Sequence, residues 1–134
     1  MYKIFTYKGS RFGLTETEFE AFKTTFLAYK KDNILPPIFG RDASYTRPPS
    51  AKENQLMHLH LSDSFHGEQL DGWSEYLTQY KRTSNTFLIY CSGIMYPKYY
   101  LLIAILQPKA HDKSEDMLFM SQLSEIAGNF RMKY

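Results

Sequence analysis

The apolar run Tyr99–Leu106 limits the possible folds more than any other segment of the chain. All of its residues are aromatic or aliphatic, whereas a strand with one solvated face alternates apolar with polar residues. The run therefore predicts a central strand that is covered on both faces. A second strand is predicted just before it, at residues 86–92.

The first helix is predicted from the residues that begin and end it. Thr15 is a good N-cap, Glu18 follows three residues later as its capping-box partner, and Asn33 lies at the end, ahead of two prolines. Four aromatic residues then share one face: Phe19, Phe22, Phe26 and Tyr29. A last helix is predicted with Ser114 as its cap and an apolar face of Phe119, Leu123, Ile126, Ala127 and Phe130.

The remaining segments complete the predicted architecture. Residues 2–7 and 56–62 alternate as strands, residues 41–54 are polar and predicted as a surface loop, and residues 64–72 are a glycine-containing loop. Residues 73–80 fit either a short helix or an irregular packed segment. This order predicts one α+β domain over residues 1–134, with a mostly antiparallel sheet of about four strands packed against N-terminal and C-terminal helices.

The composition indicates the cellular compartment of the protein. The single cysteine, Cys91, excludes an internal disulfide and is typical of a reducing compartment. No run approaches the roughly 18 apolar residues of a membrane span, so we expect a cytoplasmic protein with no membrane partner. The net charge of +2 permits a nucleic-acid partner without requiring one.

Local charge is more informative than the total. Residues 79–111 contain no Asp or Glu but carry four cations and a final histidine: Lys81, Arg82, Lys98, Lys109 and His111. A basic sheet segment of this kind indicates a surface that meets a polyanion where a titratable group can act on it. A chance cluster on a solvated sheet edge is the alternative explanation.

The histidines are the first candidates for chemistry. Strand alternation places His58 and His60 on the face opposite Met57, Leu59 and Leu61, so both can act at one site. Two imidazoles can exchange protons near neutral pH. They can also form half of a metal site with His111 as a third ligand, or they can be solvent-facing residues with no chemical role.

Arginines, lysines and one tyrosine are candidates for binding a phosphate or a base. Arg82 with Lys81 can clamp a phosphate, because a guanidinium binds two oxygens of a developing phosphorane. Arg41 and Arg131 are similar candidates, although isolated cations often serve only solubility. Tyr90 lies on the strand face opposite Cys91, where it can stack on a base. No phosphate-binding loop, nucleophile elbow or dinucleotide fingerprint is present.

A series of short motifs follows in order along nearly the whole chain. They are Tyr29-Lys30-Lys31-Asp32 with Leu35-Pro36, then Ile38-Phe39-Gly40-Arg41-Asp42-Ala43, His58-Leu59-His60-Leu61, Arg82-Thr83-Ser84, Leu88-Ile89-Tyr90-Cys91, residues 101–106 with Pro108 and His111, and the ending Phe130-Arg131-Met132-Lys133-Tyr134. In this order they resemble the YafO-type toxins of bacterial toxin–antitoxin modules.

The resemblance implies a small endoribonuclease that cuts messenger RNA in association with the translating ribosome and is held inactive by a cognate antitoxin. It also implies kinship with the RelE-like toxins, some of which carry histidines that match His60 and His111. Two features depart from that wider group. Phe87 stands where many relatives have an arginine, and the chain ends Met-Lys-Tyr where others end in a catalytic His-Tyr pair.

The resulting prediction is metal-independent RNA cleavage by attack of the substrate's own 2′-hydroxyl, with no cofactor. His60, helped by His58, is assigned as base and His111 as acid, and these two labels can be exchanged. Arg82 with Lys81 is the predicted phosphate clamp. The predicted RNA-binding residues are Arg41, Lys81, Tyr90, Lys109 and Arg131.

Two other classes of function stay open at this point. One is a metalloenzyme that uses His58, His60 and His111 as ligands. The other is a toxin of the same fold that acts by binding a protein target, although a purely binding surface has no need of paired titratable groups.

Overall fold

A five-stranded sheet forms the centre of the protein, for which the computed structural model describes residues 1–9, 12–65 and 72–134. The strands are β1 (Lys3–Thr6), β2 (Phe39–Ser44), β3 (Met57–Leu61), β4 (Phe87–Ser92) and β5 (Tyr99–Leu106). Their order in the sheet is β1-β5-β4-β3-β2. β1 pairs in parallel with β5, and every other neighbouring pair is antiparallel.

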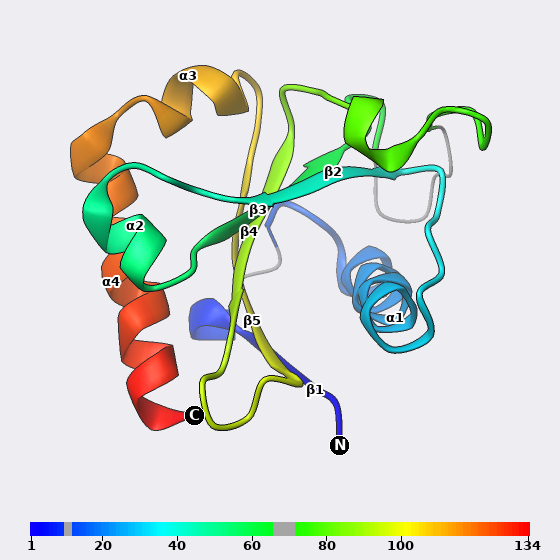
Figure 1. Cartoon of the computed structure of the whole chain (residues 1–134). Helices are drawn as coiled ribbons and strands as arrows, with labels where there is room; N and C mark the ends of the chain where they lie inside the picture. The colour runs from blue at the N-terminus through cyan, green and yellow to red at the C-terminus, as the bar shows by residue number, and fades with distance from the viewer. Residues whose placement is uncertain (10–11, 66–71) are drawn as a thin grey trace.

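Helices cover both faces of this sheet (Figure 1). α1 (Glu16–Asp32) packs on one face, while α2 (Pro49–Glu53), α3 (Ala110–Ser114) and α4 (Met117–Lys133) lie on the other. Two short 3₁₀ turns, η1 (Tyr7–Gly9) and η2 (Gln79–Lys81), complete the elements. In β5, Leu102 belongs to the hydrophobic cluster under α1, and Leu101 and Ile103 belong to the cluster under α4. The predicted two-sided cover of this strand is therefore confirmed.

The ends of α1 agree with the prediction. Thr15 accepts a hydrogen bond from the Glu18 amide, and the Glu18 carboxylate accepts one from the Thr15 amide, which completes the capping box. Asn33 closes the helix in the left-handed conformation. The alternation of β3 is also confirmed, because Leu59 and Leu61 face the α1 cluster and the two histidines face the other side.

Three parts of the prediction are wrong. Residues 41–54 are not a surface loop, since they contain most of β2 and all of α2. The sheet is mostly antiparallel as predicted, but it has five strands rather than about four, and β1 pairs with β5 in parallel. The last helix is not capped by Ser114, which ends α3, whereas the Asp116 carboxylate caps α4 by accepting the Phe119 amide. Most of the predicted loop at residues 64–72 lies outside the described residues.

The polar character of β2 has a structural cause. β2 is an edge strand, and its register with β3 shifts between Phe39 and Asp42, which is the mark of a β-bulge. The Asp42 carboxylate accepts hydrogen bonds at 2.7–3.1 Å from the hydroxyls of Tyr29 and Tyr90 and from the Lys30 ammonium. These contacts tie α1 to β2 and β4, so a polar sequence here still forms a well-anchored strand.

One buried side chain holds the segment before β4 against β2. Arg82 is only 3% exposed, and its guanidinium donates to four backbone carbonyls at 2.9–3.3 Å. Two of these carbonyls, those of Ser74 and Leu77, belong to the segment just before Arg82. The other two, those of Pro36 and Phe39, belong to the chain at the start of β2. Arg82 therefore links two segments that are distant in sequence.

The approach of these segments leaves no room for a side chain at Gly40. A Cβ at this position would overlap the carbonyl oxygen and the side chain of Arg82. The next residue, Arg41, donates its backbone N–H to the same carbonyl at 2.8 Å. The bulge of β2 is thus shaped by direct contact with Arg82.

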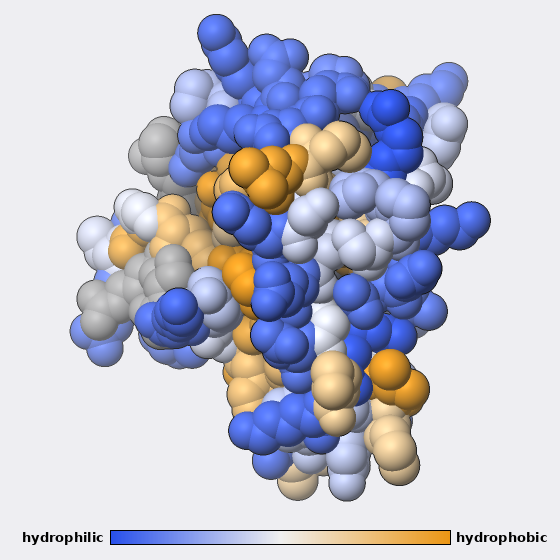
Figure 2. Space-filling view, turned by 90° about the vertical axis from the view of Figure 1, so that its left-hand side faces the viewer, coloured by the Kyte–Doolittle hydropathy of each residue, from blue (hydrophilic) through white to orange (hydrophobic). Residues whose placement is uncertain are grey.

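On the α4 side the surface is mostly hydrophilic, with hydrophobic side chains gathered in smaller groups (Figure 2). No helix among the residues that the structure describes is both long and apolar enough to cross a membrane.

Replacing Arg82 tests this packing. We expect Arg82→Met to lower the free energy of unfolding by about 3 kcal/mol, because it leaves several buried carbonyls without a donor. The exposed neighbour Lys81 supplies the control, since Lys81→Ala should change stability by less than about 0.5 kcal/mol. Chemical denaturation measures both values, and equal stability of the two variants would contradict the structural role of Arg82.

Candidate active site

An open pocket of about 620 Å³ lies at one end of the sheet, on the face that carries α3 and α4. Its walls come from β2 and the loop after it, from β3, from the turn before β4, and from the segment around α3. The lining residues include Arg41, Tyr45, Arg47, His58, His60, Ser84, Asn85, Phe87, Lys109, His111, Asp112 and Glu115. Three of the predicted catalytic residues, His58, His60 and His111, therefore share one pocket.

His60 is held in one orientation by the turn before β4. Its Nδ1 atom accepts the backbone N–H of Ser84 at 2.8 Å, and its ring packs on Phe87 with centroids 4.4 Å apart. Asp63 fixes the same turn, because its carboxylate accepts the Asn85 amide and the Thr86 hydroxyl. The side chain of His60 is thus placed by β3 and locked by a backbone donor.

The environment keeps His60 uncharged. Burial, with smaller effects from the neighbouring His58 and Arg41, lowers the pKa of His60 from 6.5 to about 4. Since Nδ1 accepts a hydrogen bond, the proton of the neutral ring is on Nε2. This tautomer does not fit the predicted role of a base, because the nitrogen that remains available already carries a proton.

His58 is packed between aromatic rings. It stacks on Tyr45 with centroids 4.2 Å apart and lies 5.2 Å from Phe87. Burial lowers its pKa, and its Nδ1 atom is buried without a hydrogen-bond partner among the described residues. Tyr45 is in turn positioned by a 2.7 Å hydrogen bond between its hydroxyl and that of Ser114. The sequence analysis missed Tyr45, because its segment was predicted to be a surface loop.

His111 differs from the other two histidines in its exposure. It lies in α3, and its side chain is 72% exposed at the mouth of the pocket. Its Nε2 is 3.9 Å from a carboxylate oxygen of Glu115, and that carboxylate also pairs with Arg47 at 2.9 Å. Lys109, two residues before His111, lines the same mouth.

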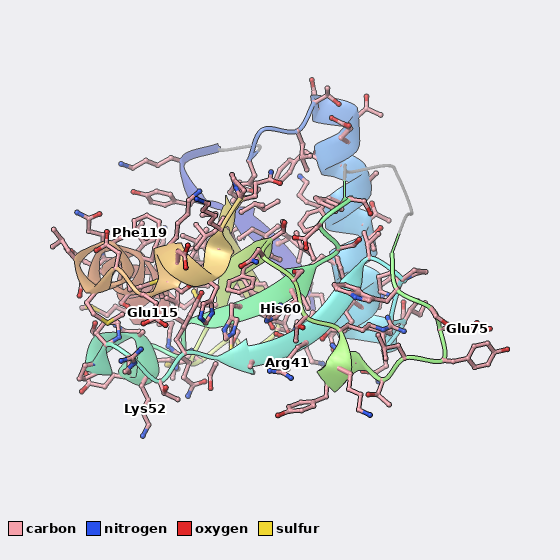
Figure 3. All side chains as sticks on the ribbon, turned by 90° about the horizontal axis from the view of Figure 1, so that it is seen from above. Arg41, Lys52, His60, Glu75, Glu115 and Phe119 are labelled. Carbon is pink, nitrogen blue, oxygen red and sulfur yellow. The ribbon has the colours of Figure 1, made fainter. Side chains whose placement is uncertain are left out.

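The cations of the pocket match the sequence analysis only in part. Arg41 and Lys109, which were predicted to bind RNA, line the pocket, and Arg47 was missed. Arg82 does not line the pocket, because its guanidinium is buried and bound to backbone carbonyls. Its predicted role as phosphate clamp is therefore wrong. Figure 3 shows Arg41 near His60 and beside η2, with Glu115 farther toward α4.

Three further predicted residues lie away from the pocket. Lys81 is exposed on η2 and is not among the lining residues. Tyr90 is 1% exposed beneath α1, with its hydroxyl bound to Asp42, so it cannot stack on a base. Arg131 donates to the Ser92 carbonyl at the far end of β4. Local sequence could not separate these residues from Arg41, because their placement depends on long-range packing.

The predicted alternative of a three-histidine metal site does not match the geometry. Among the residues that the structure describes, no three His, Cys, Asp or Glu side chains are grouped as metal ligands. Cys91 is buried.

Comparison with known proteins assigns the chain to a family. The model of the family described as "Toxin YafO, type II toxin-antitoxin system" matches residues 27–132. The mRNA interferase toxin YafO of Escherichia coli (strain K12) is 35% identical over 136 residues, covering 98% of this chain and 99% of the relative. No solved structure gives a significant match, so kinship with the RelE-like toxins stays a prediction. The chain belongs to the YafO toxin family of type II toxin–antitoxin systems.

Proposed function

We propose that this toxin is an endoribonuclease that cuts messenger RNA in the pocket between β2, β3 and α3. The observation that carries the proposal is the combination, in one pocket, of a neutral imidazole donor, an exposed imidazole and three cations: His60, His111, Arg41, Arg47 and Lys109. The full-length similarity to a relative that is named an mRNA interferase supports the same assignment.

The cations bind the phosphate. Arg41 donates its Nε–H to the Tyr80 carbonyl at 2.7 Å, and its terminal nitrogens have no hydrogen-bond partner among the described residues. They are free to bind two phosphate oxygens. Arg47 is held by Glu115 in a pair whose side chains are both more than half exposed. Exposed pairs of this kind are weak, so a phosphate can displace the carboxylate.

His60 stabilises charge and does not transfer a proton. Its Nε2–H acts as a fixed hydrogen-bond donor to a phosphate oxygen. The negative charge on that oxygen grows as the 2′-hydroxyl attacks the phosphorus. A donor that is already oriented by Ser84 needs no rearrangement during the reaction. His58, packed on Tyr45, supports the adjacent wall of the pocket.

His111 supplies the proton for the leaving group. The 2′-oxygen bonds to phosphorus and the bond from phosphorus to the 5′-oxygen breaks, which yields a 2′,3′-cyclic phosphate and a 5′-hydroxyl. The imidazolium of His111 delivers a proton to the 5′-oxygen, and water at the open mouth takes the proton of the 2′-hydroxyl. The exposure of His111 allows its proton to be replaced from solvent.

We also propose that cleavage depends on the ribosome, because the net charge of the protein is small. A net charge of +2 attracts free RNA weakly, so the ribosome would present and orient the message. Equal rates of cleavage for free and ribosome-bound messenger RNA would contradict this part. A cognate antitoxin is the partner expected for a type II toxin.

Removing the imidazole of His111 tests its role. We expect His111→Ala to lower the rate of cleavage by about 10²–10⁴-fold, the usual effect of losing a positioned acid or base. Lys113→Ala is the matched control, because Lys113 lies on the same helix outside the pocket lining. Cleavage of ribosome-bound messenger RNA measures both variants, and a near-normal rate in His111→Ala would remove this residue from the mechanism.

The tautomer of His60 can be observed directly. We expect ¹⁵N NMR at pH 7 to show an unprotonated Nδ1 and a protonated Nε2, with the ring taking up a second proton only near pH 4, because burial lowers its pKa to about 4. A resonance of protonated Nδ1 at pH 7 would instead restore His60 as a base.

The same pKa has a consequence for stability. In the unfolded chain a histidine titrates near about 6.5, so between pH 6.5 and 4 the unfolded state binds a proton that folded His60 does not. The free energy of unfolding should therefore fall as the pH is lowered through this window. Denaturation series at pH 7, 6 and 5 should show a smaller slope for His60→Gln, and an unchanged slope would contradict the low pKa.

A further inference from the structure

A second, smaller pocket adjoins the active site on the side of η2. It has a volume of about 300 Å³ and is lined by Tyr29, Arg41, Asp42, Gln79 and Tyr80. Arg41 lines both pockets, so the two adjoin at its side chain. Figure 3 shows this arrangement, with Arg41 lying between His60 and η2.

The aromatic ring of Tyr80 is presented to solvent at this place. The residue is 71% exposed, although its side chain is large and apolar over most of its surface. The guanidinium of Arg41 lies over the ring at 4.0 Å from the centroid, and Arg41 Nε binds the Tyr80 carbonyl. One face of the ring is therefore backed by a cation. Among the described residues no other aromatic ring or cation lies over Tyr80, so its high exposure makes the second face available to a ligand.

The position of Tyr80 is fixed by the surrounding contacts. Arg82 ties its segment to the chain entering β2, and the Gln79 side-chain amide donates to the Gly40 carbonyl at 2.9 Å and to the Tyr29 hydroxyl at 2.7 Å. A ring held in this way loses little freedom when a ligand stacks on it.

The polar groups of the smaller pocket also suit a base. Both amide hydrogens of Gln79 are used, and its carbonyl oxygen has no partner among the described residues, so it can accept a hydrogen bond from a ligand. The one carboxylate of the lining, Asp42, is already occupied by Lys30 and two tyrosine hydroxyls. The Asp42 carboxylate therefore repels the phosphate of a nucleotide less than a free carboxylate would.

We propose that Tyr80, backed by Arg41, is the stacking platform for the unpaired base next to the cleaved phosphate. The inference rests on the proposed function, because it assumes that the adjoining pocket binds RNA. Arg41 then binds the phosphate with its terminal nitrogens while its guanidinium face supports the ring on which the neighbouring base lies. Gln79 accepts a hydrogen bond from that base.

The experiment compares three variants in cleavage of ribosome-bound messenger RNA, with cut sites mapped. Tyr80→Ala should lower kcat/KM by about 5- to 150-fold, the range expected for the loss of one stacking contact. Tyr80→Phe keeps the ring and should stay within about twofold of the wild type. Tyr76→Ala is the matched control, since Tyr76 is 89% exposed in the same segment and lines neither pocket. It should cleave like the wild type.

The pattern of cut sites separates stacking from mere support of Arg41. If Tyr80 stacks on a base, the loss in Tyr80→Ala depends on the nucleotide at one position, with purines affected more than pyrimidines. A uniform loss at all sites, a loss equal to that of Tyr76→Ala, or a Tyr80→Phe variant as weak as Tyr80→Ala would overturn the inference. A wild-type protein that cuts no messenger RNA would overturn the proposed function and this inference together.

Discussion

The arrangement of the active site depends on the buried guanidinium of Arg82. A charged group at 3% exposure is costly unless its donors are hydrogen-bonded, and here four backbone carbonyls accept hydrogen bonds from four of its five N–H groups. Because those carbonyls come from two separate segments, meeting this requirement brings η2 against the bulge of β2. Arg41 and Tyr80 become neighbours as a result, and Arg41 also lines the pocket that contains His60. The buried cation Arg82 thus positions a second, partly buried cation, Arg41.

The second organising feature is the alternation of β3. Its leucines complete the hydrophobic cluster under α1, so its histidines must point toward the opposite face. There they lie at the border of the cluster under α4, against Phe87 and Tyr45. Burial at this border lowers the pKa of both rings, which makes them neutral. The proposed mechanism therefore assigns proton transfer to His111, which lies on a separate helix at the solvent side of the pocket.

The sequence predicts those parts of the fold that depend on local signals. The capping box of α1, the sides of β3 and the apolar run of β5 are determined by neighbouring residues and were predicted correctly. β2 could not be recognised, because its residues are placed by partners far along the chain. The Asp42 carboxylate is bound by α1 and β4, and Gly40 lies so close to Arg82 that no side chain fits there. The same cause explains why Arg82 and not Arg41 was predicted as the phosphate clamp. Nothing in the sequence around either arginine shows which guanidinium is buried, and only the folded chain does.

The central claim is that RNA is cut in this pocket when the 2′-hydroxyl of the RNA attacks the neighbouring phosphorus. Arg41 and His60 would stabilise the developing charge, and His111 would protonate the leaving group. The most direct test is to incubate the purified toxin with ribosome-bound messenger RNA and to identify the chemical groups at the new ends. The claim predicts a 2′,3′-cyclic phosphate, or the 3′-phosphate derived from it, opposite a 5′-hydroxyl, and it predicts that a message with a 2′-deoxy residue at the cut site is left intact there. A 5′-phosphate opposite a 3′-hydroxyl, or undiminished cutting at the deoxy position, would show that water or another nucleophile attacks the phosphorus and would contradict the account.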